Sequence, residues 1–146
     1  MNKPVYPVRF SKTKKTYTFT SVGENGVIQK IVAFTEFQAN VYNLGFGDFD
    51  KTTQEVDDEV VTNNGDMEKV IATVFFIIQQ FFIEKPTAWV YIEGSTPSRT
   101  RLYQVIINKF YDEFQRSYEI HGIQNDVVSP FEKNVSYDSF LIKKLL

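Results

Sequence analysis

The side chains best suited to binding chemistry gather in one segment, between Glu93 and Tyr103. The members that could hold an anion carry hydroxyl or guanidinium groups: Ser95, Thr96, Ser98, Arg99 and Arg101. Hydroxyl groups can donate hydrogen bonds to phosphate or carboxylate oxygens, and guanidinium groups can neutralise their charge. The segment therefore predicts an anion site for a phosphate-bearing ligand or a nucleic-acid backbone, with Glu93 and Tyr103 at its rim.

The neighbouring residues predict a strand that leads into a helix at this site. Residues 88–92 are apolar or aromatic and uncharged, which favours a strand buried on both faces in the middle of a sheet. Gly94 then permits a sharp turn, Thr96 can accept a hydrogen bond as the helix N-cap, and Pro97 suits the first helical position. Such a helix start directs unpaired amides and the positive end of the helix dipole at one place.

Two interpretations of this turn stay open at the level of sequence. Arg99 and Arg101 would lie in the first helical turn, where positive charge is unfavourable for the dipole, and a bound anion would account for them. Alternatively, the hydroxyl groups only cap the helix and the arginines pair with nearby carboxylates. The segment lacks the spacings of the nucleotide-binding loops G-x-x-x-x-G-K-[ST] and G-x-G-x-x-G.

Alternating apolar residues predict an antiparallel meander in the first third of the chain. A strand at 16–21 is expected to continue through an Asn25-Gly26 hairpin turn into residues 27–36. A third strand is expected at 41–49, with three large side chains facing inward: Tyr42, Leu44 and Phe46. Residues 5–10 predict only a marginal edge strand, because Pro7 has no N–H to donate to a neighbouring strand.

Apolar residues at helical spacing predict two long helices. The first runs from Met67 to about Lys85 with Asp66 as its N-cap, and the second from about Pro97 to Tyr118. His121 follows the second helix and is expected to stabilise its C-terminus, with general-base chemistry as the alternative. A short strand near 120–123 and a tail that packs back on the domain, with a strand or a helical turn at its end, complete the chain.

The predicted order is βββαβα followed by a short C-terminal element. It indicates one α+β domain over residues 1–146, with a mainly antiparallel sheet and two long helices. This order resembles that of ribonuclease H-like domains. Those domains place metal-binding carboxylates on the first strand, the first helix and the end of the fourth strand. Glu68 and Glu93 match two of these places, but the strand at 16–21 carries no acid. A metal-dependent nuclease is therefore an alternative with an incomplete set of ligands.

The composition excludes several kinds of chemistry. The 146 residues include no cysteine and one histidine, which excludes disulfides, thiolate metal sites and zinc sites built on a histidine pair. A formal charge of −2 gives no general attraction for nucleic acid. The longest apolar run is too short to span a membrane, and the amino terminus lacks an apolar targeting segment. We expect a cytoplasmic protein that needs no metal or cofactor, does not associate with membranes and is not an enzyme.

An acidic segment and a broad apolar helix suggest a second kind of function. Residues 48–59 are rich in Asp and Glu, which favours a solvated loop with a short edge strand at 59–61. The helix at 67–85 carries apolar residues around much of its circumference, which favours either core packing or contact with another chain. The alternative function is therefore protein interaction, with a partner or a second copy docked on helix 67–85 and the acidic segment, as in a toxin–antitoxin or other two-component system. A metal site is a further alternative for the acidic segment.

Two segments also resemble a known family. NGDMEKVIATV at 64–74 and EGSTPSRTRLY at 93–103 are similar to the signature segments of a family of small uncharacterised bacterial proteins, a domain of unknown function. The resemblance covers most of the chain and implies a bacterial source and a short α+β domain. It brings no assigned activity and no catalytic residue. From the residues themselves we expect a binding or regulatory domain with an anion site at 94–101.

Overall fold

The computed structural model describes residues 4–50, 55–57 and 65–146, which contain one nine-stranded sheet and two helices. The strands are β1 (Arg9–Phe10), β2 (Thr16–Gly23), β3 (Gly26–Gln38), β4 (Val41–Asp50), β5 (Glu55–Asp57), β6 (Trp89–Ile92), β7 (Tyr118–Gln124), β8 (Val127–Pro130) and β9 (Ser139–Lys144). The helices are α1 (Met67–Glu84) and α2 (Pro97–Phe114). The predicted α+β class is confirmed.

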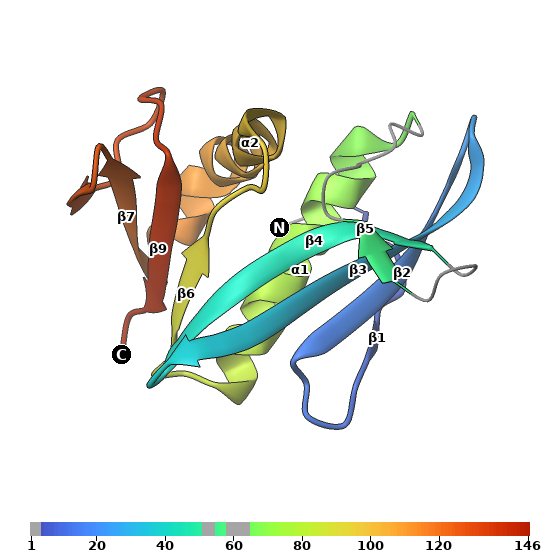
Figure 1. Ribbon diagram of the computed structural model, residues 1–146, viewed down its shortest axis with the longest axis horizontal. Coiled ribbons are helices and arrows are strands. Elements are labelled where there is room, and N and C mark those ends of the chain that lie inside the picture. The colour runs from blue at the N-terminus through green and yellow to red at the C-terminus, as the bar shows by residue number, and fades with distance from the viewer. Residues whose placement is uncertain (1–3, 51–54, 58–64) are drawn as a thin grey trace.

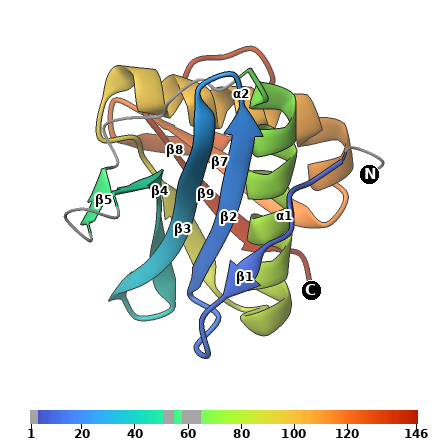
Figure 2. The same ribbon diagram turned by 90° about the vertical axis from the view of Figure 1, so that its right-hand side faces the viewer.

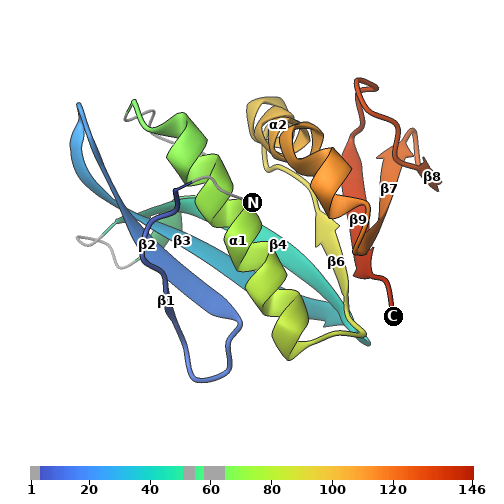
Figure 3. The ribbon, with the colours of Figure 1, turned by 180° about the vertical axis from the view of Figure 1, so that it is seen from behind.

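The sheet is mainly antiparallel, as predicted. Its strands follow the order β1-β2-β3-β4-β6-β9-β7-β8, and β5 pairs with the last residues of β4. Among the described strands, β4 and β6 form the parallel pair. Opposite views show that α1 and α2 lie on the same face of the sheet (Figures 1 and 3). The fold therefore has two layers, and the apolar core lies between them.

The predicted hairpin is confirmed, with its turn one residue earlier in the chain than expected. Gly23 pairs with Gly26, so Glu24 and Asn25 form a two-residue turn. Gly26, the residue after the turn, has φ +93°, a conformation that glycine adopts without steric cost. The strands alternate as expected, and the inward-facing side chains are buried: Tyr17, Phe19, Tyr42, Leu44 and Phe46.

The first helix is confirmed with nearly the predicted bounds, and its wide apolar surface is largely buried within the chain. Phe81 stacks on Phe34 of β3 with ring centroids 4.0 Å apart, and Phe75 stacks on Phe110 of α2 at 4.3 Å. Burying one such side chain stabilises the fold by about 1.5–3 kcal/mol. The helix is thus held on one side by the sheet and on another by α2.

The C-terminal part differs from the prediction in two ways. The second helix ends at Phe114 rather than near Tyr118, because Tyr118 already pairs with Lys144 in the sheet. The tail packs back on the domain and ends in a strand, β9, which was one of the two expected forms, but its place in the interior of the sheet, between β6 and β7, was not predicted. Phe140 and Ile142 of β9 are fully buried.

Two other strands are also corrected. The expected strand at 5–10 pairs with β2 only at its last two residues. β6 does lie in the middle of the sheet, but it is buried on one face alone. Val90 and Ile92 point into the core, whereas Trp89 and Tyr91 are half-buried on the face that no helix covers. The edge strand expected at 59–61 lies outside the described residues.

Candidate functional site

The predicted strand-to-helix junction forms where expected, and its turn is held by specific contacts. The Thr96 hydroxyl accepts a hydrogen bond from the Arg99 amide at 3.2 Å, so Thr96 is the N-cap, and Pro97 is the first helical residue. The Gly94 amide donates to the Thr100 hydroxyl at 3.1 Å. A Cβ on Gly94 would lie 2.2 Å from the Thr100 amide nitrogen, so the close approach of turn and helix requires glycine here.

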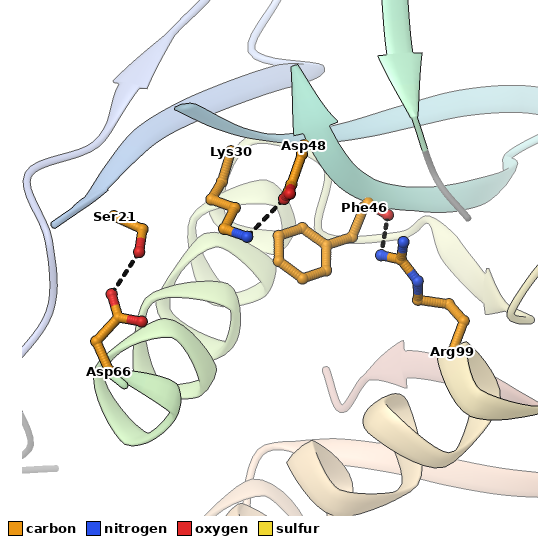
Figure 4. A network of polar contacts seen from close by, with 6 residues as sticks. All are labelled: Ser21, Lys30, Phe46, Asp48, Asp66 and Arg99. Atoms are coloured by element: carbon orange, nitrogen blue, oxygen red, sulfur yellow. Dashed lines mark hydrogen bonds and ion pairs between the residues drawn. The ribbon is translucent and has the colours of Figure 1, made fainter. Parts of the chain in front are cut away.

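Arg99 is the most unusual side chain of the junction. It is only 3% exposed, and its guanidinium donates from Nη1 to the carbonyl of Phe46 in β4 (Figure 4). The Phe46 ring centroid lies 5.6 Å from its guanidinium carbon. Nη2 is buried without a hydrogen-bond partner, and Arg99 forms no ion pair with any described residue. The structure thus contains a buried cation without a described counter-ion.

Arg101 points elsewhere. Helical residues two positions apart do not share a face, and Arg101 is exposed where Arg99 is buried. The two guanidinium groups therefore do not converge in the way the sequence suggested. Within the described ranges Arg101 also forms no ion pair, so the alternative in which carboxylates satisfy both arginines gains no support.

Four of the five predicted residues nevertheless line one cavity. This cavity, of about 380 Å³, lies beside the first two turns of α2, and we call it the α2 cavity. Its polar lining comes from Thr96, Ser98, Arg99 and Arg101, and its apolar lining from Met67, Leu102 and Val105. No carboxylate is among these residues. Positive charge and hydroxyl groups without competing acids are what an anion needs.

The remaining predicted residues line two neighbouring cavities. Ser95 and Glu93 contribute to both, one of about 460 Å³ shared with Arg101 and Asp138, and one of about 220 Å³ shared with Arg99 and Tyr103. Glu93 also accepts a hydrogen bond from the Tyr91 hydroxyl at 3.0 Å. Each of these two cavities contains at least one carboxylate, so neither matches an anion as well as the α2 cavity does.

The apolar wall of the α2 cavity was missed at the level of sequence. Met67 opens α1 and lies far along the chain from the junction, so nothing local connects it with Leu102 and Val105. The sequence could have predicted Leu102 and Val105 as neighbours of the site, since they follow Arg101 by about one helical turn or less. The wall shows that a ligand here could carry an apolar group beside its charge.

Figure 4 also shows a second polar pair, which is formed by Lys30 and Asp48. Lys30 of β3 is fully buried and pairs with Asp48 of β4, directly opposite in register. Its alternation with Val32 and Phe34 could have predicted its inward position. Because Lys30 has a carboxylate partner, its charge is compensated in a way that the charge of Arg99 is not.

Asp66 occupies the N-cap position of α1, as predicted, but its side chain does not cap the helix. The carboxylate instead accepts hydrogen bonds from the Ser21 and Tyr6 hydroxyls. Burial, together with the hydrogen bond to Asp66, raises the pKa of the Tyr6 hydroxyl. Asp66 therefore ties β2 and the N-terminal segment to the start of α1.

The nuclease alternative gains no cluster of ligands. Glu68 pairs with Lys109 at 2.7 Å, and Glu93 with the Tyr91 hydroxyl. In the part of the chain that the structure describes, no three His, Cys, Asp or Glu side chains are grouped as metal ligands would be. The first long strand, β2, is separated from β6 by β3 and β4. His121 lies within β7 and contacts Glu119 at 2.7 Å, so it is not at the C-terminus of α2 as expected.

The interaction alternative rested on the apolar circumference of α1 and on the acidic segment. Ile77 is fully buried and Phe76 half-buried, which leaves Ile83 as the exposed large apolar side chain of this helix. Half of the acidic segment lies outside the described residues. Its described half was expected as a loop but forms the end of β4 and the whole of β5, which pair with each other. Neither described helix has the length and hydropathy to cross a membrane.

The chain belongs to a family of unknown function, DUF6934, whose model matches residues 2–145. This agrees with the expected resemblance to a domain of unknown function that covers most of the chain. No curated protein and no solved structure matches the chain significantly. The function of the family is unknown, so a function for this chain has to be argued from the site itself.

Proposed function

We propose that this member of the family is a binding domain that holds a phosphate-bearing ligand in the α2 cavity. One observation carries the proposal: Arg99 is a buried cation without a described carboxylate partner, and it lines this cavity. Burying a charge is costly unless an opposite charge or hydrogen bonds compensate it. The cost is greater here, because Arg99 lies in the first turn of α2, where the helix dipole disfavours positive charge. A bound anion would offset both the cost of burying the charge and its unfavourable interaction with the helix dipole.

The other polar residues of the cavity have distinct roles in this proposal. Pro97 has no amide hydrogen, and the Arg99 amide is already bonded to Thr96, so Ser98 supplies the first-turn amide for a ligand. The exposed Ser98 hydroxyl adds a second donor. Arg101 approaches from solvent and neutralises the charge of the anion. Arg99 contributes a fixed positive charge from below, held in place by the Phe46 carbonyl.

The apolar wall favours a phosphate attached to a larger molecule. Met67, Leu102 and Val105 would contact a group next to the phosphate. A phosphomonoester or a nucleic-acid backbone fits this description, whereas free phosphate would leave the wall unused. Free phosphate remains the simplest probe of the charged part.

Calorimetric titration with inorganic phosphate and with a short single-stranded oligonucleotide, at low and high salt, tests the proposal. We expect binding at low salt that weakens as salt screens the charges. Arg101→Ala should weaken binding about tenfold or more, the effect of losing a hydrogen bond to a charged group. Arg116→Ala is the matched control, since it removes an exposed arginine beyond the other end of α2. Equal effects of the two substitutions, or no binding by the folded protein, would refute the site.

Arg99→Met gives an independent measurement. It replaces the buried charge with an apolar side chain of similar length and so removes the cost of burying that charge. We expect the variant to remain folded. Phosphate should raise the melting temperature of the parent but not that of the variant, because a ligand stabilises only a protein that binds it. A variant that phosphate still stabilises as strongly as the parent would contradict the role of Arg99.

A further inference from the structure

Residues 4–8, the N-terminal segment, pack on α1 before the chain enters the sheet. Figure 2 shows it running beside the helix before it reaches β1. The Tyr6 amide donates to the Thr73 hydroxyl at 2.9 Å, and the Tyr6 ring stacks on Phe19 with centroids 5.9 Å apart. The chain first pairs in the sheet at Arg9 and Phe10. This detour leaves a space between the segment, the edge of the sheet and α1.

The space is a cavity of about 420 Å³, which we call the N-terminal cavity. Small-molecule sites in proteins typically enclose roughly 300–1,000 Å³. Val5 and Val8 form one wall and Tyr17 of β2 another, while Phe76, Gln80 and Glu84 form the wall of α1. The three helical residues recur every four positions and therefore share one helix face. The cavity has no lining residue in common with the α2 cavity.

Phe76 offers an unused aromatic surface to this cavity. The other phenylalanines of α1, which are Phe75, Phe81 and Phe82, each contact another aromatic ring. Among the described residues Phe76 has no such contact, and its side chain is only half-buried. Aromatic rings gain from offset-stacked or edge-to-face contact with a second ring. The cavity can supply that contact through an aromatic ligand.

Gln80 supplies one polar group on the same face. Its side-chain amide makes no hydrogen bond with the described residues, and an amide can both donate and accept. The charged groups at the end of the cavity are already satisfied, since Lys14 pairs with Glu84 at 2.9 Å. The hydroxyl of Tyr17 donates to the Lys14 carbonyl at 2.8 Å. A ligand would thus find one open polar partner and no unpaired charge.

We propose that the N-terminal cavity binds a small uncharged aromatic molecule that carries one hydrogen-bonding group. Its ring lies against Phe76 and its polar group meets the Gln80 amide. The apolar side chains Val5 and Val8 cover the opposite side of the ring. The site is independent of the anion site, so either can fail without the other.

Calorimetric titration of the whole chain with indole and with 1-methylindole tests the proposal. The two probes share a ring system, but only indole has an N–H to donate. We expect the parent protein to bind indole about fivefold more tightly, the effect of one net hydrogen bond. Phe76→Ala should weaken both probes by about two- to tenfold, the range for loss of an aromatic pair.

Gln80→Leu and Gln79→Leu form a matched pair. Both residues are half-buried on α1, but only Gln80 lines the cavity. We expect Gln80→Leu to abolish the preference for indole and Gln79→Leu to retain it, with helix content of both checked by circular dichroism. The proposal is overturned if the folded parent binds neither probe, if it binds both equally, or if the two leucine variants behave alike.

Discussion

At the scale of single residues, the junction at 94–97 depends on steric fit as much as on hydrogen bonds. Gly94 is fixed by its contact with the first turn of α2, and Thr96 by the amide that it caps. These two residues set where the helix begins. The position of the helix then decides that Arg99 enters the core and Arg101 stays in solvent.

Gly94→Ala is expected to lower the free energy of unfolding by about 1–3 kcal/mol, the usual cost of overpacking. The added Cβ would lie 2.2 Å from the Thr100 nitrogen and 2.7 Å from the Arg99 carbonyl carbon. Both are backbone atoms, so only a shift of the helix start can relieve the contact. Urea unfolding measures the change. Gly45→Ala is the control, because its nearest neighbour is the Ala33 carbonyl oxygen at 3.9 Å, and equal losses would contradict the argument.

The sequence revealed which kinds of side chain lie at the candidate site, but not the directions in which these side chains point. Hydroxyl and guanidinium groups near a helix start are visible in the order of residues alone. The burial of Arg99 depends on β4, whose Phe46 carbonyl it contacts from a distant part of the chain. Met67 joins the α2 cavity for a similar reason, through the packing of two helices. Contacts between distant segments are the part that local pattern cannot supply.

At the scale of elements, locally encoded features were predicted well. The turn at Glu24 and Asn25, followed by Gly26, determines the pairing of β2 with β3, and helical periodicity determines α1. The elements that were misjudged depend on pairing across the chain. β1 is short because Tyr6 bonds to α1, and β9 is interior because β6 and β7 leave a place between them.

Removing β9 should therefore abolish cooperative folding. A chain that ends at residue 138 would lose the fully buried Phe140 and Ile142 and would leave β6 and β7 with unpaired edges. Exposed strand edges favour aggregation, so we expect an aggregating or molten product. Chemical unfolding followed by fluorescence of the sole tryptophan, Trp89 on the adjacent strand, measures the loss. Removing Leu146 alone, which is 88% exposed, should change little, and cooperative unfolding of the shorter chain would contradict the prediction.

At the scale of the whole molecule, the two-layer arrangement sets the environment of the tyrosines. Both helices cover one face of the sheet, so side chains on that face are removed from water (Figure 3). Burial raises the pKa of Tyr6, Tyr17 and Tyr118, and for Tyr17 it raises the pKa to about 12, with the charge of Glu84 adding to the effect. Partial burial also raises the pKa of Tyr91, although Tyr91 lies on the face that no helix covers. The folded state therefore holds these hydroxyl protons more tightly than the unfolded chain does.

This difference predicts that the protein loses stability at alkaline pH. In the unfolded chain a tyrosine releases its proton near its ordinary pKa of 10.0, whereas in the folded state Tyr17 keeps it until about 12. The contribution to stability is thus complete below pH 10 and is lost as the pH rises through this window, because only the unfolded state gains from deprotonation. Urea unfolding at a series of pH values measures the fall. Tyr17→Phe should flatten it, even though the loss of the hydrogen bond to Lys14 lowers the starting value. A parent and a variant with the same slope between pH 10 and 12 would show that Tyr17 titrates normally in the folded protein.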